Sequence, residues 1–316
     1  MGRYTNLDGT TPDKGLAEVL RWQIGRLTTA KRPDPAGFKT PRRPNDGSAL
    51  RSSSPSLTWI GHATFVQRLG GALIATDPIW SERIQTVIPR FAEPGVALDD
   101  TPPIDIVTVS HAHFDHMDVA TLRRIAQRSP RALFVVPRDN GDVLRRAGLP
   151  RIVELGWWET HREGDVSITL VPAHHWSMRL PWDRNTRLWG GFVYTSPEGT
   201  SYHAGDTAFN EGVFRAIGER FPDIDWAMLP IGAYDPTWFM QPQHMGPEEA
   251  GRAFDLLGAR NLCAMHWGTF RLTDEPMSEP PERLRAWWRT AGTESGGHDA
   301  SRLWIFDVGE TRALAR

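Results

Sequence analysis

The chain has 316 residues and 40% of them are hydrophobic, which is enough for one large buried core or two smaller ones. Its 36 basic and 38 acidic side chains leave a formal net charge of −2, so the overall charge predicts no nucleic-acid partner. The single cysteine, Cys263, excludes both an intramolecular disulfide and a cluster of thiolate metal ligands.

The amino-terminal residues lack the apolar segment of a secretion signal, and no run of about 18 uncharged apolar residues occurs, so we expect a cytoplasmic protein. Residues 14–27 carry apolar side chains at helical spacing beside basic ones. Such a helix either packs on its own domain or makes peripheral contact with an anionic membrane. Residues 32–55 are rich in Pro, Arg, Ser and Gly, which predicts an extended arm. We therefore divide the chain into an N-terminal helix and arm, residues 1–56, and a main domain, residues 57–316.

Strands and helices alternate along the main domain. Strands are expected at 57–60, 64–69, 72–76, 106–109, 132–137, 151–155, 166–172, 191–195, 201–203, 225–231, 261–265 and 302–307. Helices are expected at 119–127, 139–147, 212–220, 247–257 and 281–290. Residues 81–103 are expected to form a loop whose apolar character is typical of a pocket wall. The alternation favours an α/β fold built in layers.

Side chains that bind metals follow several of these strands. After the strand at 106–109 come His111, His113, Asp115 and His116, all within six positions. If the backbone stays extended, residues 111, 113 and 115 lie on one side while His116 points elsewhere, which suits two neighbouring metal ions. Clustered imidazoles and a carboxylate would each need a partner if buried, so core filling is a poor explanation. Asp77, at an earlier strand end, either accepts an imidazole N–H or forms a turn.

Three later strand ends carry the same residue types. His174 and His175 follow the strand at 166–172, Asp206 follows 201–203, and His266 follows 261–265. Because loops at one edge of a layered sheet converge, we expect these side chains to meet the first cluster. Spacing alone does not choose between His174 and His175. Neutral imidazoles and carboxylates suit zinc, and they also suit iron and manganese.

These motifs resemble the metallo-β-lactamase fold superfamily, whose members are four-layer αββα sandwiches with a binuclear metal site between two sheets. Within it, the chain resembles the N-acylphosphatidylethanolamine-hydrolysing phospholipase D family over nearly its whole length. The strings that carry the similarity include Trp59-Ile-Gly-His-Ala-Thr64, Thr76-Asp-Pro-Ile79, Leu155-Gly-Trp-Trp-Glu159, Ala204-Gly-Asp-Thr207, Pro230-Ile-Gly-Ala-Tyr234, Gln243-His244 and His266-Trp-Gly-Thr-Phe270. The resemblance implies that residues 57–316 form a metallo-β-lactamase-like hydrolase domain and that the protein is a homodimer.

The resemblance further implies seven metal ligands in two sets that share one residue. The sets are His111, His113 and His175 for one metal, Asp115, His116 and His266 for the other, and Asp206 bridging both. The two ions are expected to be zinc, with iron and manganese as alternatives. Held about 3.5–4 Å apart, they would lower the pKa of a bridging water, and the hydroxide would attack phosphorus. Asp115 and Asp206 would orient that hydroxide.

His244 is the predicted catalytic residue outside the ligand set, because the resemblance places the matching histidine at the substrate phosphate. There it would steady the developing oxyanion or protonate the leaving alkoxide. We assign Gln243, Tyr234 and Trp238 to substrate binding together with His244. The apolar cluster that contains Tyr234 and Trp238 either beds an acyl chain or belongs to the core.

The predicted activity is a phospholipase D that releases N-acylethanolamine and phosphatidic acid from an N-acylated phospholipid. One alternative is a metal-dependent lactonase or esterase similar to the L-ascorbate 6-phosphate lactonases, because the same hydroxide attacks a carbonyl carbon. Another is a non-catalytic lipid-binding protein, although every expected ligand position is filled. Four further histidines lack a comparable context and are predicted at turns or on the surface: His62, His161, His203 and His298.

Overall fold

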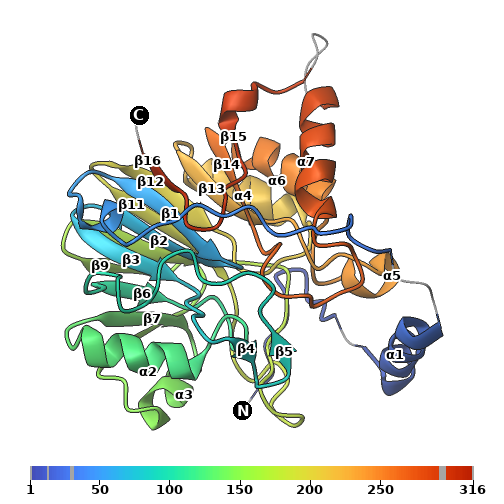
Figure 1. The fold of residues 1–316 in the computed structure, drawn as a ribbon. Coiled ribbons are helices and arrows are strands. Elements are labelled where there is room, and N and C mark those ends of the chain that lie inside the picture. The colour runs from blue at the N-terminus through green and yellow to red at the C-terminus, as the bar shows by residue number, and fades with distance from the viewer. Residues whose placement is uncertain (1, 13, 29–31, 292–296, 315–316) are drawn as a thin grey trace.

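The computed structural model describes residues 2–12, 14–28, 32–291 and 297–314. In this part of the chain two seven-stranded sheets lie face to face, and helices cover the outer side of each (Figure 1). The arrangement is a four-layer αββα sandwich, so the predicted fold class is confirmed.

The first sheet is antiparallel on one side and parallel on the other. Its strands, in spatial order, are β16 (Thr311–Ala313), β1 (Ser56–Gly61), β2 (Thr64–Leu69), β3 (Ala72–Thr76), β6 (Ile106–Thr108), β7 (Leu133–Pro137) and β8 (Arg151–Leu155). The four strands from β3 to β8 run parallel to one another. Their carboxyl ends therefore lie at one edge of the sheet, where loops of different chain segments converge.

The second sheet has the same mixed construction. Its strands, in spatial order, are β15 (Leu303–Trp304), β14 (Asn261–Met265), β13 (Trp226–Pro230), β12 (Gly199–His203), β11 (Gly191–Ser196), β10 (Val166–Val171) and β9 (Thr160–Glu163). The strands from β12 to β15 are parallel, and β9 to β12 form an antiparallel meander.

The helices lie in separate groups (Figure 1). Two cover the first sheet, α2 (Val119–Arg128) and α3 (Gly141–Arg146), and three cover the second, α4 (Glu211–Arg220), α6 (Pro247–Leu257) and α7 (Glu279–Thr290). The remaining elements are α1 (Leu16–Thr28), α5 (Thr237–Met240), the short hairpin of β4 (Arg83–Ile84) and β5 (Ile88–Pro89), and two 3₁₀ turns, η1 (Ala49–Arg51) and η2 (Ala300–Arg302). None of the helices described combines the length and the apolar character that crossing a bilayer requires.

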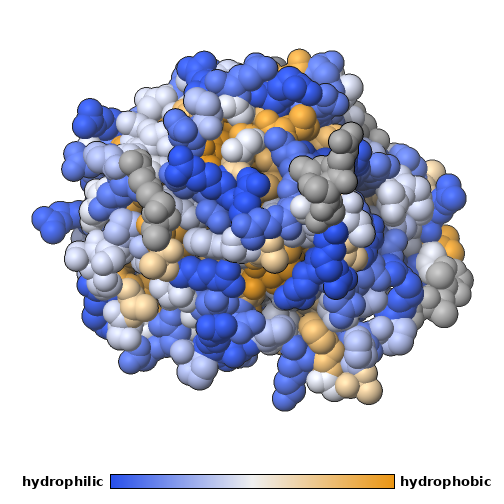
Figure 2. All heavy atoms as spheres, turned by 90° about the horizontal axis from the view of Figure 1, so that it is seen from above, coloured by the Kyte–Doolittle hydropathy of each residue, from blue (hydrophilic) through white to orange (hydrophobic). Residues whose placement is uncertain are grey.

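Alternate side chains of the first sheet enter two different cores, as the two-residue period of a strand requires. Ile106 and Val135 project between the sheets, whereas Val107 and Phe134 pack with Leu122 of α2 on the outer side. All five side chains are fully buried, so burial of apolar surface stabilises the packing of the first sheet against both the second sheet and α2. On the face shown in Figure 2, polar side chains predominate and apolar atoms show mainly in recesses between them.

Most predicted elements are confirmed within two residues at each end, and the helix predicted near residues 14–27 is α1. The strand predicted at 302–307 is wrong in length, because pairing with β14 covers only two residues. Four short strands and α5 were not predicted, including the β4–β5 hairpin inside the loop expected at 81–103. These elements are two to four residues long, too short to show a hydrophobic period.

The amino-terminal arm contacts the region where the second sheet ends. The side-chain oxygen of Asn6 accepts hydrogen bonds from the backbone N–H of His175 (3.0 Å) and from Nε1–H of Trp189 (3.1 Å). Further along, Trp22 of α1 stacks on Phe239 of α5 with ring centroids 4.8 Å apart. The arm therefore helps to place a predicted metal ligand, although the division of the chain at residue 56 stays a prediction.

Candidate metal centre

The predicted ligands follow strand ends at the facing edges of both sheets. His111 lies beyond β6, His175 beyond β10, Asp206 beyond β12 and His266 directly after β14. The structure brings these residues together with His113, Asp115 and His116 in one buried cluster. Residues separated by more than 150 positions thus meet because the two sheets pack with these edges adjacent.

The segment that carries four of the donors is a turn and not an extended strand. The carbonyl of His113 accepts hydrogen bonds from the backbone N–H of His116 (3.2 Å) and of Met117 (2.7 Å). The expected alternation of residues 111, 113 and 115 in an extended backbone is therefore wrong. The turn brings all four donors into the same cluster, and it does so by reversing the chain between them.

Three imidazoles form the first donor group, which we define as His111, His113 and His175. Nε2 of His111 lies 2.8 Å from Nδ1 of His113, and that nitrogen lies 3.3 Å from Nε2 of His175. Ligand nitrogens about 2.0–2.1 Å from a tetrahedral zinc ion lie roughly 3.3 Å from each other. The spacing of this group therefore fits a metal ion at its centre.

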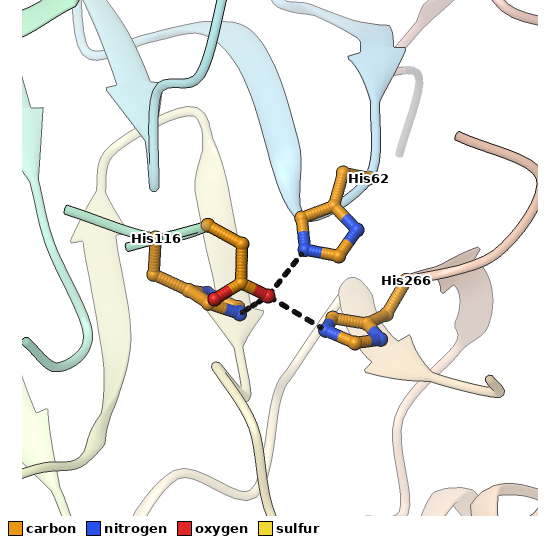
Figure 3. A group of neighbouring side chains, drawn as sticks. His62, His116 and His266 are labelled. Atoms are coloured by element: carbon orange, nitrogen blue, oxygen red, sulfur yellow. Dashed lines mark hydrogen bonds and ion pairs between the residues drawn. The ribbon is translucent and has the colours of Figure 1, made fainter. Parts of the chain in front are cut away.

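The second donor group is Asp115, His116 and His266. Oδ2 of Asp115 lies 3.4 Å from Nε2 of His116 and 3.8 Å from Nε2 of His266. In Figure 3 the rings of His116 and His266 point toward this carboxylate; His116 lies in the turn after β6 of the first sheet, and His266 follows β14 of the second. The donor atoms of this group lie within 4.8 Å of one another, which is compatible with binding to one ion.

Asp206 lies between the two donor groups. Its Oδ2 is 3.2 Å from Nε2 of His116 and 3.9 Å from Nε2 of His175, and its Oδ1 is 3.1 Å from Nε2 of His266. Nε2 of His116, both ring nitrogens of His266 and Oδ1 of Asp206 are buried without a hydrogen-bond partner. Buried polar atoms are rarely left unpaired, so Nε2 of His116, Nε2 of His266 and Oδ1 of Asp206, which face one another, fit a role as metal ligands.

Groups outside the cluster orient three of the imidazoles through Nδ1. Nδ1 of His116 lies 2.7 Å from Oδ2 of Asp77, Nδ1 of His111 lies 2.9 Å from Oγ of Ser110, and Nδ1 of His175 donates to the carbonyl of Gln243 (2.8 Å). A hydrogen bond at Nδ1 leaves the lone pair on Nε2 for a metal. Of the two interpretations of Asp77, the one as an imidazole acceptor is therefore correct, whereas the roles of Ser110 and Gln243 were not foreseen.

Gly205 allows the end of β12 to approach the end of β6. Its φ is +62°, and a Cβ placed on it would lie 2.6 Å from Cβ of Ser110. A side chain at this position would therefore be strained and would also displace the residue that contacts His111. The glycine is the local reason that Asp206 can lie beside the histidine-rich turn.

Burial and the carboxylates act in opposite directions on the pKa values of the histidines. Burial lowers the pKa of His113 to about 4 and that of His111 well below its usual value. Burial acts in the same direction on His116 and His266, but the nearby carboxylates, Asp206 first, outweigh it. They raise the pKa of His116 well above its usual value and that of His266 to about 9. The imidazoles of the first group are thus neutral at pH 7. In the second group, His116 and His266 are protonated, and a bound metal ion would displace those protons.

His62 lies at a turn, as predicted, but it is buried and contacts a predicted ligand, and the turn or surface position predicted for His203 is wrong. His62 lies in the turn between β1 and β2 and is 1% exposed, with Nε2 3.0 Å from Oδ2 of Asp115 (Figure 3). His203 is fully buried, and its Nε2–H donates to the carbonyl of Ala63 (2.9 Å). Burial lowers the pKa of His62 to about 3, so its ring is neutral at pH 7. The flanking strands mix apolar residues with Thr58, Thr64 and Gln67, so the sequence contains no signal of this burial.

The structure shows which of the neighbouring residues His174 and His175 faces the cluster. His175 belongs to the first donor group, whereas Nδ1 of His174 faces Asp8 (3.7 Å) and the side chain of Asn210 (3.3 Å) on the other side of the chain. His161 and His298 are partly exposed and lie beside carboxylates, as expected for histidines near the surface.

His244 lies against the cluster, with Nδ1 3.9 Å from Oδ2 of Asp206. It lines an apolar pocket of about 410 Å³, which also contains Gln243, and a separate polar pocket of about 240 Å³, which contains Tyr234. Trp238 is 42% exposed and does not line the apolar pocket, whereas its neighbour Phe239 does. The four predicted substrate residues therefore do not line a single pocket, and His244 is the one that both share.

The chain matches known proteins in sequence and in structure. The family described as Beta-lactamase superfamily domain matches residues 73–267. An uncharacterized protein of Mycobacterium tuberculosis is 37% identical over 301 residues, which cover 90% of this chain and 78% of that protein. The N-acyl-phosphatidylethanolamine-hydrolyzing phospholipase D 1 of Caenorhabditis elegans is 35% identical over 242 residues, which cover 72% of this chain and 68% of that protein.

Among solved structures, the chain resembles Igni18, a metallo hydrolase of the archaeon Ignicoccus hospitalis, with a TM-score of 0.61. The two are 23% identical, and the match covers 82% of this chain and 97% of that chain, which supports the fold alone. With the sequence matches, the chain belongs to the beta-lactamase superfamily and, within it, to the family of N-acyl-phosphatidylethanolamine-hydrolyzing phospholipase D proteins. A metal-dependent hydrolase of Pyrobaculum aerophilum is also 33% identical over 233 residues, which cover 73% of this chain and 90% of that protein, so the chain is an enzyme, a metal-dependent hydrolase.

Proposed function

We propose that the protein is a binuclear phosphodiester hydrolase of the phospholipase D kind. The position of Asp206 carries this proposal, because its carboxylate contacts both donor groups. Its Oδ1 lies 3.1 Å from Nε2 of His266, and its Oδ2 lies 3.2 Å from Nε2 of His116 and 3.9 Å from Nε2 of His175. A carboxylate that lies between two sets of ligands and contacts both is the arrangement expected of a residue that bridges two metals. The imidazole and carboxylate donors suit zinc.

A bound metal pair would supply Lewis acidity to a phosphoryl oxygen and lower the pKa of water to near neutrality. The chain's own residues hold the site in shape. Asp77, Ser110 and the carbonyl of Gln243 fix the orientation of three imidazoles, and Asp115 and Asp206 supply the negative charge that two cations require. Because these groups are buried, the electrostatic interactions among them are stronger than they would be in water.

In this proposal His244 binds the substrate phosphate. Burial lowers the pKa of its ring to about 4, so at pH 7 the imidazole is neutral and one of its nitrogens carries a proton. A neutral N–H beside Asp206 can donate a hydrogen bond to a phosphoryl oxygen and stabilise charge that develops there. We therefore assign it the role of a hydrogen-bond donor to the phosphate.

The two pockets at His244 favour an amphiphilic substrate. The apolar pocket contains Phe114, Trp176 and Phe239 as well as Asp115 and Asp206, so an apolar chain bound there would have its polar end at the donor groups. The smaller pocket on the other side of His244 is lined by polar and charged side chains, including Arg252 and Glu248. An N-acylated phospholipid, the substrate named for the Caenorhabditis relative, has this combination of apolar chains around a phosphodiester.

We also propose that the mouth of the apolar pocket docks on an anionic phospholipid surface. Four segments that line this pocket also carry large exposed apolar side chains: Leu20 and Ile24 on α1, Val87 in the β4–β5 turn, Leu180 and Trp182 in the loop after His175, and Trp238 on α5. Lys14 and Arg21 lie against the aromatic rings of α5 and add positive charge to the same region. Apolar side chains next to basic ones are typical of proteins that bind the surface of anionic bilayers.

Vesicle sedimentation tests this docking surface. We expect binding to vesicles of phosphatidylcholine with phosphatidylserine, weaker binding at high salt, and a loss of at least fivefold when Val87 and Trp182 are both replaced by serine. The matched control is Leu7→Ser, which removes a leucine that is also exposed (54%) but lies outside the four segments. Equal binding of the double variant and the control would contradict the proposal.

The test of the reaction combines metal quantification with a panel of three substrates: an N-acylated phospholipid, a soluble bis-aryl phosphodiester and a lactone. We expect two equivalents of metal and turnover of both phosphodiesters. Turnover of the lactone alone would make the protein a lactonase. Two bound metals without any turnover would instead support a non-catalytic lipid-binding role.

A further inference from the structure

The backbone of His62 is held by both of its polar groups. Its N–H donates to Oγ1 of Thr269 (2.7 Å), and its carbonyl accepts from Nε1–H of Trp59 (3.0 Å) and from the backbone N–H of His266 (3.0 Å). The residue has a φ of 56°, in the left-handed region that non-glycine residues seldom adopt. The turn between β1 and β2 is therefore tied directly to a member of the second donor group.

The ring of His62 is packed as firmly as its backbone. Its ring centroid lies 4.1 Å from that of His266 and 5.4 Å from that of Phe270, which it meets edge-on. In this position its Nε2 is 3.0 Å from Oδ2 of Asp115, and Figure 3 shows the ring directed at that carboxylate. These ring contacts support the orientation in which Nε2 faces Asp115.

Asp115 lacks another comparable restraint among the residues that the structure describes. His111, His116 and His175 each have a hydrogen-bond partner outside the seven predicted ligands, whereas the hydrogen bond that Asp115 receives from outside this set is the one from His62. The carboxylate also lines the apolar pocket, so it borders the space where substrate would enter. A carboxylate on a turn at such a border needs a fixed donor if it is to keep one orientation.

We propose that His62 is a positioning residue, whose Nε2–H donates to Oδ2 of Asp115 and holds that carboxylate in the second donor group. The role rests on the binuclear site proposed above. Oδ2 lies 3.4 Å from Nε2 of His116 and 3.8 Å from Nε2 of His266, so a small rotation of the Asp115 side chain would take its oxygen away from both. Through its carbonyl and its ring, His62 fixes the distance between two members of the same group.

Two substitutions separate the hydrogen bond from the packing. His62→Phe keeps an aromatic ring against His266 but removes the N–H, whereas His62→Gln places an amide N–H close to the position of Nε2. The zinc dissociation constants of both sites are measured by competition with a chromogenic chelator. The visible absorption of Co²⁺ in the second site reports on its coordination independently of turnover.

For His62→Phe we expect one zinc to bind 10- to 100-fold more weakly, the range found when a partner of a metal ligand is removed. The other zinc should bind as in the parent protein, and the Co²⁺ spectrum should change. His62→Gln should restore the affinity to within about threefold. When Asp115 is already alanine, His62→Phe should cause no further weakening, because the effect passes through Asp115.

Three results would overturn the inference while leaving the proposed function intact. They are unchanged zinc binding in His62→Phe, a His62→Gln variant as weak as His62→Phe, and further weakening in the Asp115→Ala background, which would make His62 a direct ligand. A parent protein that binds fewer than two metals would refute the binuclear site itself, and with it this role.

Discussion

Asp77→Asn is the substitution whose consequence follows most directly from the geometry. Asp77 is 1% exposed and accepts three hydrogen bonds: Oδ1 from the backbone N–H of Ser110 (2.6 Å), and Oδ2 from Oγ–H of Ser110 (2.6 Å) and from Nδ1–H of His116 (2.7 Å). Oγ of Ser110 in turn lies 2.9 Å from Nδ1 of His111. One carboxylate therefore orients a histidine in each donor group.

The magnitude follows from the change of one oxygen to an NH₂ group. If the amide nitrogen replaces Oδ1, it faces the N–H of Ser110, and an unpaired buried donor costs about 1–3 kcal/mol of the free energy of unfolding. If it replaces Oδ2, His116 must accept at Nδ1 and carry its proton on Nε2, where the metal would bind. We then expect metal affinity to fall 10- to 100-fold, or about 1.4–2.7 kcal/mol.

The assay is a metal titration together with denaturant unfolding of the metal-free protein. Asp105→Asn is the matched control, because Oδ2 of Asp105 accepts a hydrogen bond from the backbone N–H of Leu73 (2.8 Å) in the same sheet and touches no histidine. Both variants lose one negative charge. If Asp77→Asn bound metal and unfolded like Asp105→Asn, the argument that Asp77 sets the orientation of His116 would fail.

Three further predictions concern the centre itself. Asp206→Asn should abolish turnover and weaken at least one metal, measured by metal analysis and kinetics, and unchanged turnover would reject its bridging role. His244→Ala should keep both metals while phosphodiester turnover falls at least 100-fold, and loss of a metal would show that it is a ligand. Because the pKa of His266 is raised to about 9 and that of His116 well above its usual value, both rings are protonated at pH 7 in metal-free protein. Metal binding must displace these protons, so affinity should rise with pH from 6 to 9, and a flat profile in metal titrations would contradict this.

Local patterns in the sequence were enough to predict the layered fold and the location of the donors. An apolar run followed by a ligand-type residue marks a strand that ends at a loop, as at His111 and His266. These signals are local because the period of a strand and the length of an apolar run are properties of a few consecutive residues. The resemblance of the motifs to a known family then groups the donors into two sets.

Other features depended on segments that are distant in the sequence. Nothing near His174 and His175 tells which ring turns toward Asp206, because the choice is made where β10 ends against the turn at 111–116. His62 and Asp115 are 53 residues apart, and their 3.0 Å contact exists because β1 and β6 belong to one sheet. The composition of the sequence near His62 is that of an ordinary turn.

The sequence by itself therefore determined which side chains are available and at which strand ends they lie. The tertiary structure alone decided which nitrogen of each imidazole faces inward and which carboxylates are restrained. The physical reason is that hydrogen bonds and coordination act over about 2–3 Å. Orientation at that range is set by the packing of two sheets against each other, and no short segment of the chain contains that information.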